Sequence, residues 1–208
     1  MVRKAILHSV DEAIRAAQFL KEPKSLAFIE EAAHAITTCY RKGNKLLIAG
    51  NGGSICDAMH FAEEMTGQFR SKRAALAAIA LADPAHLTCV ANDMGYESVF
   101  SRGVEALGKP GDLFIALTTS GNSPNLIAAA QKAKEMELIT IAFLGKTGGK
   151  MKGMADLEWI VPNFPYSDRI QEAHMAAIHI IIESVELCLF ALGSSSGGKR
   201  SLNEALGS

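Results

Sequence analysis

Helical spacing of apolar residues characterises the first part of the chain. Apolar positions recur every three to four residues over 3–20 and again over 25–42, with a break near Pro23. Neither segment contains an apolar run that is typical of a strand. We therefore expect residues 1–42 to form two amphipathic helices that pack on the rest of the protein or at an oligomer interface.

From residue 43 the pattern changes to short apolar runs that alternate with longer helical segments. The predicted strands are 45–49, 76–81, 113–118, 139–144 and 157–161, and the predicted helices are 54–69, 84–92, 97–107, 124–137 and 168–192. Such alternation is typical of an α/β fold whose parallel sheet is covered by helices on both faces. We predict a three-layer sandwich around a five-stranded parallel sheet, and a flexible tail of small and polar residues at 194–208.

Composition narrows the classes of partner. The 208 residues are 49% hydrophobic and carry a formal net charge of −1, so no global field attracts nucleic acid or an anionic membrane. The four cysteines lie far apart without a CxxC pair, which argues against a zinc ribbon or a redox dithiol. Because the N-terminus does not read as an export signal either, we expect a cytoplasmic protein.

One segment, 173–192, is apolar enough to resemble a membrane span. Four ionisable residues interrupt it, namely His174, His179, Glu183 and Glu186. Such groups are costly in lipid, so we predict a helix that is buried in a soluble core or in an oligomer interface, and no membrane partner.

Two loops rich in glycine and hydroxyl residues follow predicted strands. The first loop is 51–54 and the second is 118–123. The carboxyl ends of parallel strands meet at one edge of a sheet, and backbone N–H groups at helix N-termini bind anions. The first loop matches neither GxGxxG nor a P-loop, and alone it is equally well a tight turn. Together the loops predict a sugar-phosphate site with hydroxyl donors from Ser54, Thr118, Thr119, Ser120 and Ser123.

His60 and Glu64 form a candidate acid–base pair, because residues four apart share one face of the helix that follows the first loop. An exposed ion pair and a core histidine are the alternatives. His179 lies in the most apolar predicted helix, where a hydrogen-bonded core histidine is again an open interpretation. Helical spacing places Glu172, before Gln171, on the face of His179.

Polar residues also stand at two predicted helix boundaries. Asp93 either orients a catalytic group or caps the helix that is expected from residue 97. Ser167 or Asp168 caps the last predicted helix. Spacing alone does not decide between these roles.

Four motifs together resemble the bacterial phosphoheptose isomerases of the sugar isomerase (SIS) domain superfamily. They are GNGGSICDAMHFAEEMTG, AIALADPAHLTCVANDMGYESVFSRGVEALGKPGD, TTSGNSPN and DRIQEAHMAAIH, and they occur in the family's order and spacing. The resemblance identifies residues 43–193 as a SIS domain. It implies a homotetramer with active sites at subunit interfaces. It also implies interconversion of sedoheptulose 7-phosphate and D-glycero-D-manno-heptose 7-phosphate, the first step toward the heptose of lipopolysaccharide.

The resemblance also assigns roles to individual residues. It makes Glu64 the catalytic base and His179 the catalytic acid. The implied phosphate contacts come from Asn51, Gly52, Gly53, Ser54, Thr118, Ser120 and Ser123, and the implied sugar contacts from Asp93, Asp168 and Gln171. Some family members bind zinc through the positions of His60, Glu64, Gln171 and His179. The resemblance thus favours Gln171 where helical spacing favours Glu172.

The chain departs from the family pattern at Gln68, where relatives commonly have arginine, and Arg70 or Arg73 could replace that cation. Thr118, a serine in many relatives, keeps its hydroxyl. Two other functions remain as alternatives: a non-catalytic SIS protein that binds the replication initiator DnaA, and a module that senses sugar phosphates. Because the chain keeps both Glu64 and His179, we expect an enzyme.

Overall fold

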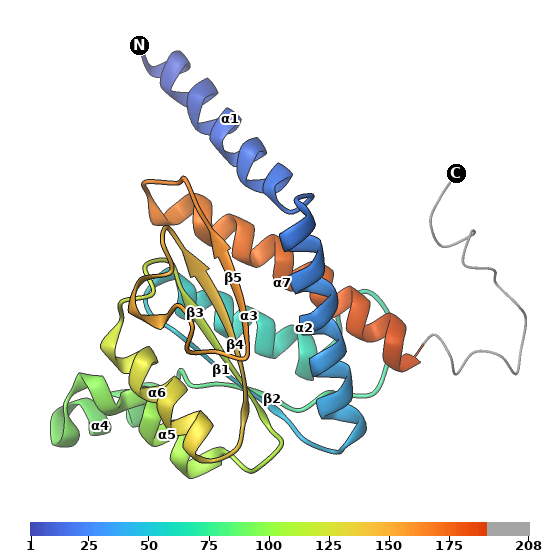
Figure 1. The fold of residues 1–208 in the computed structure, drawn as a ribbon, viewed down its shortest axis with the longest axis vertical. Coiled ribbons are helices and arrows are strands. Elements are labelled where there is room, and N and C mark those ends of the chain that lie inside the picture. The colour runs from blue at the N-terminus through green and yellow to red at the C-terminus, as the bar shows by residue number, and fades with distance from the viewer. Residues whose placement is uncertain (191–208) are drawn as a thin grey trace, which may run out of the picture.

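Five parallel strands form the centre of the protein, as the computed structural model of residues 1–190 shows (Figure 1). Their order across the sheet is β2-β1-β3-β4-β5. The strands are β1 (Leu46–Gly50), β2 (Ala78–Ala80), β3 (Leu113–Thr118), β4 (Ile139–Gly145) and β5 (Leu157–Val161). The predicted five-stranded parallel sheet is confirmed. The predicted tail, residues 194–208, lies outside the described residues.

Helices cover both faces of the sheet because neighbouring residues of a strand point to opposite sides. In β1, Leu46 and Ile48 belong to one hydrophobic core, and Leu47 and Ala49 belong to the other. The first core packs against α2 (Pro23–Arg41), α3 (Gly53–Thr66) and α7 (Ser167–Phe190), and the second against α4 (Pro84–Met94), α5 (Val99–Leu107) and α6 (Pro124–Glu135). Every residue of β1 and β3 is buried, as expected for a sheet between two helical layers.

The first helix, α1 (Val2–Phe19), extends away from the body of the protein (Figure 1). Only Ala16 on this helix is buried. An apolar stripe at four-residue spacing, Val2, Ile6, Val10 and Ile14, stays between 48% and 72% exposed. The predicted amphipathic helix is therefore present, but much of its apolar face lies uncovered in a single chain.

Several boundaries differ from the predicted ones. Pro23 begins α2 instead of breaking the chain, since the first residue of a helix needs no N–H donor. The strand expected over 76–81 keeps only Ala78–Ala80, at the edge of the sheet. The helix expected from residue 97 starts as a 3₁₀ turn, η1 (Tyr96–Ser98), and the short turn η2 (Gly149–Met151) precedes β5.

The long apolar helix α7 packs one face against the sheet. By length and composition it could cross a membrane. Its buried residues instead belong to the first core, namely Ile170, Ala173, Ala177, Ile178, Ile181, Ile182 and Val185. The imidazole of His174 is fully buried and bonds the carbonyl oxygen of Leu144 at 3.1 Å. One face of the predicted helix is thus buried in the core, while Ile180 and Leu187 on the rest of the helix are 40% and 53% exposed.

Candidate active site

The two predicted loops lie side by side because their strands are neighbours. Gly50 at the end of β1 pairs with Leu117 of β3, so the chain leaves both strands at the same edge of the sheet. The loops enclose a cavity of about 290 Å³, which we call the loop cavity. It is lined by Asn51, Gly52, Gly53, Ser54, Leu117, Thr118, Thr119, Ser120, Ser123, Ser167 and Gln171.

Three helices begin at the loop cavity. Gly53 is the first residue of α3, Ser123 precedes the first residue of α6, and Ser167 begins α7. The N-terminus of a helix carries a partial positive charge and free N–H donors, so this arrangement favours an anion. None of the described side chains that line the cavity is charged. An anion there would be held by hydroxyls, amides and backbone N–H groups.

Two glycines allow the close packing around the loop cavity. A Cβ on Gly53 would lie 2.6 Å from Nε2 of Gln171, so the glutamine amide reaches the start of α3 only because Gly53 has no side chain. Gly121 has a φ of +65°, and a Cβ there would lie 1.8 Å from the carbonyl oxygen of Gly148. The second loop therefore packs directly on neighbouring backbone.

The hydroxyls of the second loop also shape the loop itself. Oγ1 of Thr118 accepts a hydrogen bond from the N–H of Gly121 at 3.1 Å, and Oγ of Ser120 accepts one from Asn122 at 3.2 Å. An accepting hydroxyl keeps its own hydrogen as a donor. Both groups can thus hold the loop and still donate to a ligand.

Ser167 is a cavity residue that the sequence interpretation treated only as a helix cap. Oγ1 of Thr119 donates to Oγ of Ser167 at 3.0 Å, which connects the second loop to the start of α7. Ser167 follows β5, so the same rule that gathers loops at the carboxyl ends of strands could have identified it.

Asn51 uses its side chain differently from the expected phosphate contact. Its amide pairs with that of Asn125 at 3.0 and 2.9 Å, and its oxygen also accepts the hydroxyl of Tyr96 at 2.9 Å. Neither Asn125 nor Tyr96 was a candidate from the sequence. Asn51, the partner of both residues, is distant from them in the chain, so no local sequence pattern identifies Asn125 or Tyr96.

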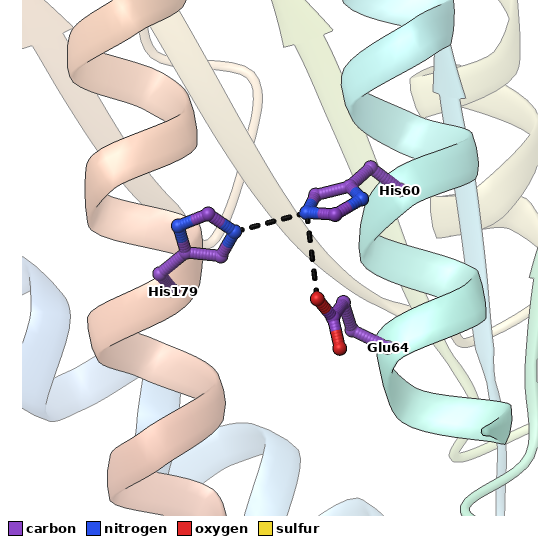
Figure 2. A group of neighbouring side chains, drawn as sticks. All are labelled: His60, Glu64 and His179. Carbon is purple, nitrogen blue, oxygen red and sulfur yellow. Dashed lines mark hydrogen bonds and ion pairs between the residues drawn. The ribbon is translucent and has the colours of Figure 1, made fainter. Parts of the chain in front are cut away.

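His60, Glu64 and His179 form a second group, shown in Figure 2, which we call the imidazole–carboxylate cluster. Nε2 of His60 lies 3.0 Å from Nε2 of His179 and 3.5 Å from Oε1 of Glu64. One ligand atom from each of the three side chains lies within 4.8 Å of the others. The predicted meeting of positions 64 and 179 therefore occurs within one chain.

The imidazole–carboxylate cluster and the loop cavity are separate within one chain. His60 lies seven residues after Gly53, and His179 lies eight residues after Gln171, which corresponds to about 10–12 Å along each helix. No member of the cluster lines the cavity. Of the four predicted metal ligands, the structure brings together three and leaves the Gln171 amide beside Gly53.

Helical spacing favoured Glu172 over Gln171 as the partner of His179, but neither side chain joins the imidazole–carboxylate cluster. Glu172 forms an ion pair with Arg169 at 2.6 Å, and Arg169 also donates to the hydroxyl of Ser9 on α1 at 3.0 Å. Glu172 thus pairs with a residue that contacts α1, whereas Gln171 lines the loop cavity. Ideal spacing identifies a helix face but not the neighbour that it meets.

The two predicted aspartates lie outside both groups. Asp93 is near the end of α4, where its carboxylate accepts from the amide of Asn92 at 2.7 Å. It does not cap the next helix, since η1 follows Gly95 and has no side-chain cap. Asp168 accepts from the backbone N–H of Arg169 at 2.9 Å in the first turn of α7.

The arginines near Gln68 are engaged in joining α3 to α7. The Arg73 guanidinium donates to the carbonyl oxygen of Glu64 at 2.6 Å and to Glu186 at 2.7 Å. Arg70 pairs with Glu183. Neither arginine lines the loop cavity. They hold together the two helices that carry the imidazole–carboxylate cluster.

Asp57 is a further titratable group that the sequence interpretation missed. Burial raises the pKa of its carboxyl to about 6, and the nearby His60 opposes part of that shift. Its buried Oδ2 atom has no hydrogen-bond partner among the described residues. Asp57 lies three residues before His60 on the same helix, and this spacing could have identified it from the sequence.

Comparison with known proteins identifies the class that this fold and site define. A family model for the SIS domain matches residues 10–145. The phosphoheptose isomerase of Fusobacterium nucleatum is 54% identical over 83% of this chain and 89% of its own length. That of Sodalis glossinidius is 48% identical over 93% of this chain and 100% of its own.

A solved structure is similar to this chain over most of its length. The phosphoheptose isomerase from Neisseria gonorrhoeae superimposes with a TM-score of 0.83 and 38% identity, over 89% of this chain and 99% of that one. Within the SIS domain proteins, the chain belongs to the phosphoheptose isomerase family. The resemblance seen in the sequence motifs is confirmed.

Proposed function

We propose that the protein is an aldose–ketose isomerase that interconverts sedoheptulose 7-phosphate and D-glycero-D-manno-heptose 7-phosphate. This is the first step of ADP-heptose and lipopolysaccharide core synthesis. The observation that carries the proposal is the meeting of Glu64 with two imidazoles, two helical turns from an uncharged, hydroxyl-lined cavity. The DnaA-binding and sensing alternatives are not favoured, since the relatives at 54% and 48% identity are isomerases by name.

The proposed mechanism moves a proton between two neighbouring carbons of the sugar. The carboxylate of Glu64 removes the proton from the carbon next to the carbonyl, which gives an enediol. His179 donates a proton to the carbonyl oxygen to complete the enediol. Glu64 then returns its proton to the former carbonyl carbon while His179 recovers a proton from the neighbouring hydroxyl, which becomes the new carbonyl. Each positioned acid or base contributes roughly 10²–10⁴-fold to the rate.

The loop cavity supplies orientation in this mechanism. Ser54, Thr118, Ser120 and Ser123 donate to the phosphate, together with backbone N–H groups of the first loop. Fixing the phosphate lowers the entropic cost of presenting the far end of the sugar to the acid–base groups. The amide of Gln171 lies at the same cavity and is placed to contact the sugar. We assign Asp93 and Asp168 sugar contacts from the family pattern.

A zinc ion is a further part of the proposal. His60, Glu64 and His179 offer two imidazoles and one carboxylate, the donor set of many catalytic zinc sites, with ligand atoms within 4.8 Å. The donor chemistry therefore fits the metal. Zinc held by Glu64 and His179 would occupy the lone pairs that both groups use in proton transfer, and it would supply a Lewis acid that polarises the carbonyl oxygen instead. Gln171, the fourth ligand that the resemblance implies, lies beside Gly53 in the same chain.

We further propose a homotetramer with active sites at subunit interfaces. The exposed apolar stripe of α1, Val2, Ile6, Val10 and Ile14, supports this assembly because soluble proteins seldom leave such a stripe uncovered. The separation of the imidazole–carboxylate cluster from the loop cavity within one chain also supports it. A neighbouring subunit can then complete each site.

We place the enzyme in the cytoplasm. All four cysteines are free thiols, with Cys39 buried and Cys56, Cys89 and Cys188 exposed. Exposed free thiols are typical of a reducing compartment.

The deciding experiment is incubation with sedoheptulose 7-phosphate, followed by NMR for a new heptose phosphate, with and without a chelator. We expect conversion, and a loss of rate with the chelator if zinc takes part in catalysis. Binding of the sugar phosphate without conversion would favour the sensing module. Binding to DnaA without conversion would favour the replication protein.

A further inference from the structure

Two asparagine amides connect the loops of the cavity. Nδ2 of Asn51 donates to Oδ1 of Asn125 at 3.0 Å, and Nδ2 of Asn125 donates back to Oδ1 of Asn51 at 2.9 Å. Asn51 directly follows β1, and Asn125 lies in the first turn of α6, after the second loop. The reciprocal pair therefore spans the two loops across 74 residues of chain.

The orientation of both amides is fixed by their other partners. Oδ1 of Asn125 also accepts the backbone N–H of Leu126 at 2.9 Å, and Oδ1 of Asn51 also accepts the hydroxyl of Tyr96 at 2.9 Å. Turning either amide over would oppose donor to donor. Asn125 is only 2% exposed, so no bulk water replaces a lost bond.

These bonds leave the Asn51 side chain little capacity for a ligand. Its oxygen accepts two hydrogen bonds and one of its N–H groups is occupied. The neighbouring Gly52, Gly53 and Ser54 line the loop cavity, as do Ser120 and Ser123 on the other side. The amide pair thus sits between the two sets of donors and sets the distance between them.

We infer that Asn125 is a positioning residue for the phosphate site, acting through Asn51, with Tyr96 as a second support for the same amide. This inference rests on the proposed role of the loop cavity in binding the phosphate. Phosphate contacts are remote from the reacting carbons and exist both before and during the reaction. Their loss is therefore expected mainly as an increase of KM.

The central variant is Asn125→Asp, which keeps the shape but places an oxygen where Nδ2 donates to Asn51. We expect ~10-fold increases in KM for sedoheptulose 7-phosphate and in Kd for inorganic phosphate, with a smaller change in kcat. Asn51→Asp is expected to weaken phosphate binding similarly. Because the two amides act as a pair, the double variant Asn51→Ala/Asn125→Ala is expected to lose much less phosphate-binding free energy than the sum of the losses in the two single variants.

The chain offers a matched control at the opposite ends of the same two strands. Nδ2 of Asn44, just before β1, donates to the carbonyl oxygen of Gly111, just before β3, at 2.8 Å. Asn44→Ala removes an amide bond between the same strands without touching the cavity. It is expected to lower the Tm while leaving KM and phosphate Kd within about twofold of wild type.

Tyr96→Phe guards against misfolding of the buried variants. Tyr96 is 59% exposed, so loss of its hydroxyl alone is expected to keep the fold. We expect an affinity for phosphate about twofold weaker, as is typical for the loss of one partly exposed hydrogen bond. Unchanged phosphate affinity in Asn125→Asp, or equal effects in Asn44→Ala, would overturn the inference, and unchanged affinity in Tyr96→Phe would remove the second support from Tyr96. If the wild-type protein binds phosphate but does not isomerise the sugar, the proposed function is refuted. The role of Asn125 is then still decided by the phosphate Kd of the variants.

Discussion

Nε2 of His60 lies 3.0 Å from Nε2 of His179, although 119 residues separate them along the chain. Two ring nitrogens at this distance share one proton, so one donates and the other accepts. Nδ1 of His60 faces the carboxylate of Glu63 at 2.9 Å, which assigns a hydrogen to Nδ1. Nε2 of His60 is then free to face Nε2 of His179, so the two imidazoles are held edge to edge between α3 and α7.

Removing the carboxylate at position 64 is expected to stop turnover. Glu64→Gln keeps the size of the side chain and loses the base, so kcat is expected to fall to about 1% or less. Phosphate binding is expected to persist because Glu64 does not line the loop cavity. Kinetics and phosphate calorimetry on the same preparation test both statements. Glu135→Gln, at an exposed ion pair on α6, is the control, and a Glu64→Gln enzyme with more than a few per cent of the activity would exclude the base role.

Zinc content provides a test of the metal proposal that does not depend on activity. Elemental analysis of the purified protein is expected to find about one zinc per chain. His60→Gln and His179→Gln each remove an imidazole ligand and are expected to lower zinc affinity at least tenfold. His34→Gln, at an exposed position on α2, is expected to leave the content unchanged. Zinc retained in full by both site variants would place the metal elsewhere.

The apolar stripe of α1 is expected to support the tetramer. Val10→Glu places a charge on a side chain that is 48% exposed in the single chain, so the monomer fold is expected to tolerate it. Burying that charge between subunits is costly, and light scattering is therefore expected to report a smaller assembly than for wild type. Lys4→Glu on the same helix is the control for charge alone. Equal masses for all three proteins would rule out this stripe as the interface.

Stability is expected to decrease in mild acid through His174. Burial lowers the pKa of this imidazole from 6.5 to about 4, since the protonated form has no water around it in the core. Between pH 6.5 and about 4, His174 binds a proton in the unfolded chain but stays neutral in the folded protein. The contribution of His174 to stability is thus complete above pH 6.5 and decreases by about 3 kcal/mol as the pH falls to about 4, while the raised pKa of Asp57 acts in the opposite direction over the same range.

Urea unfolding between pH 4 and pH 8, with a chelator present, measures this dependence. His174→Leu is expected to be less stable at neutral pH because it removes the hydrogen bond to the carbonyl oxygen of Leu144, and its acid dependence is expected to be flatter. His34→Gln is expected to retain the wild-type curve. An unchanged slope in His174→Leu would show that other groups cause the acid sensitivity.

The fold was largely predictable because the sheet is buried on both faces. The runs at β1 and β3 are apolar throughout, which is typical of central parallel strands, and their neighbouring ends predicted the two-loop cavity. The edge strand β2 was predicted too long at its start, because Leu76 is buried but its N–H bonds the carbonyl oxygen of Met65 on α3 at 3.0 Å instead of β1.

The long-range contacts of the site could not be derived from spacing. Helix geometry favoured Glu172, but it takes no account of side-chain partners. The carboxylate of Glu172 forms an ion pair with Arg169, which also bonds Ser9 on α1. The amide pair of Asn51 and Asn125 joins distant segments, so no periodic pattern contains it. The position of His179 beside His60 depends on how α7 crosses α3, and only the family resemblance anticipated it.

The uncharged lining of the loop cavity determines how the protein responds to ionic strength. Attraction between full charges weakens as dissolved ions screen it, whereas short contacts from hydroxyls and backbone N–H groups are screened much less. Substrate can therefore be retained over a wide range of salt concentrations. If the phosphate binds there as proposed, release of the product does not require separating an anion from an arginine or lysine among the described residues that line the cavity.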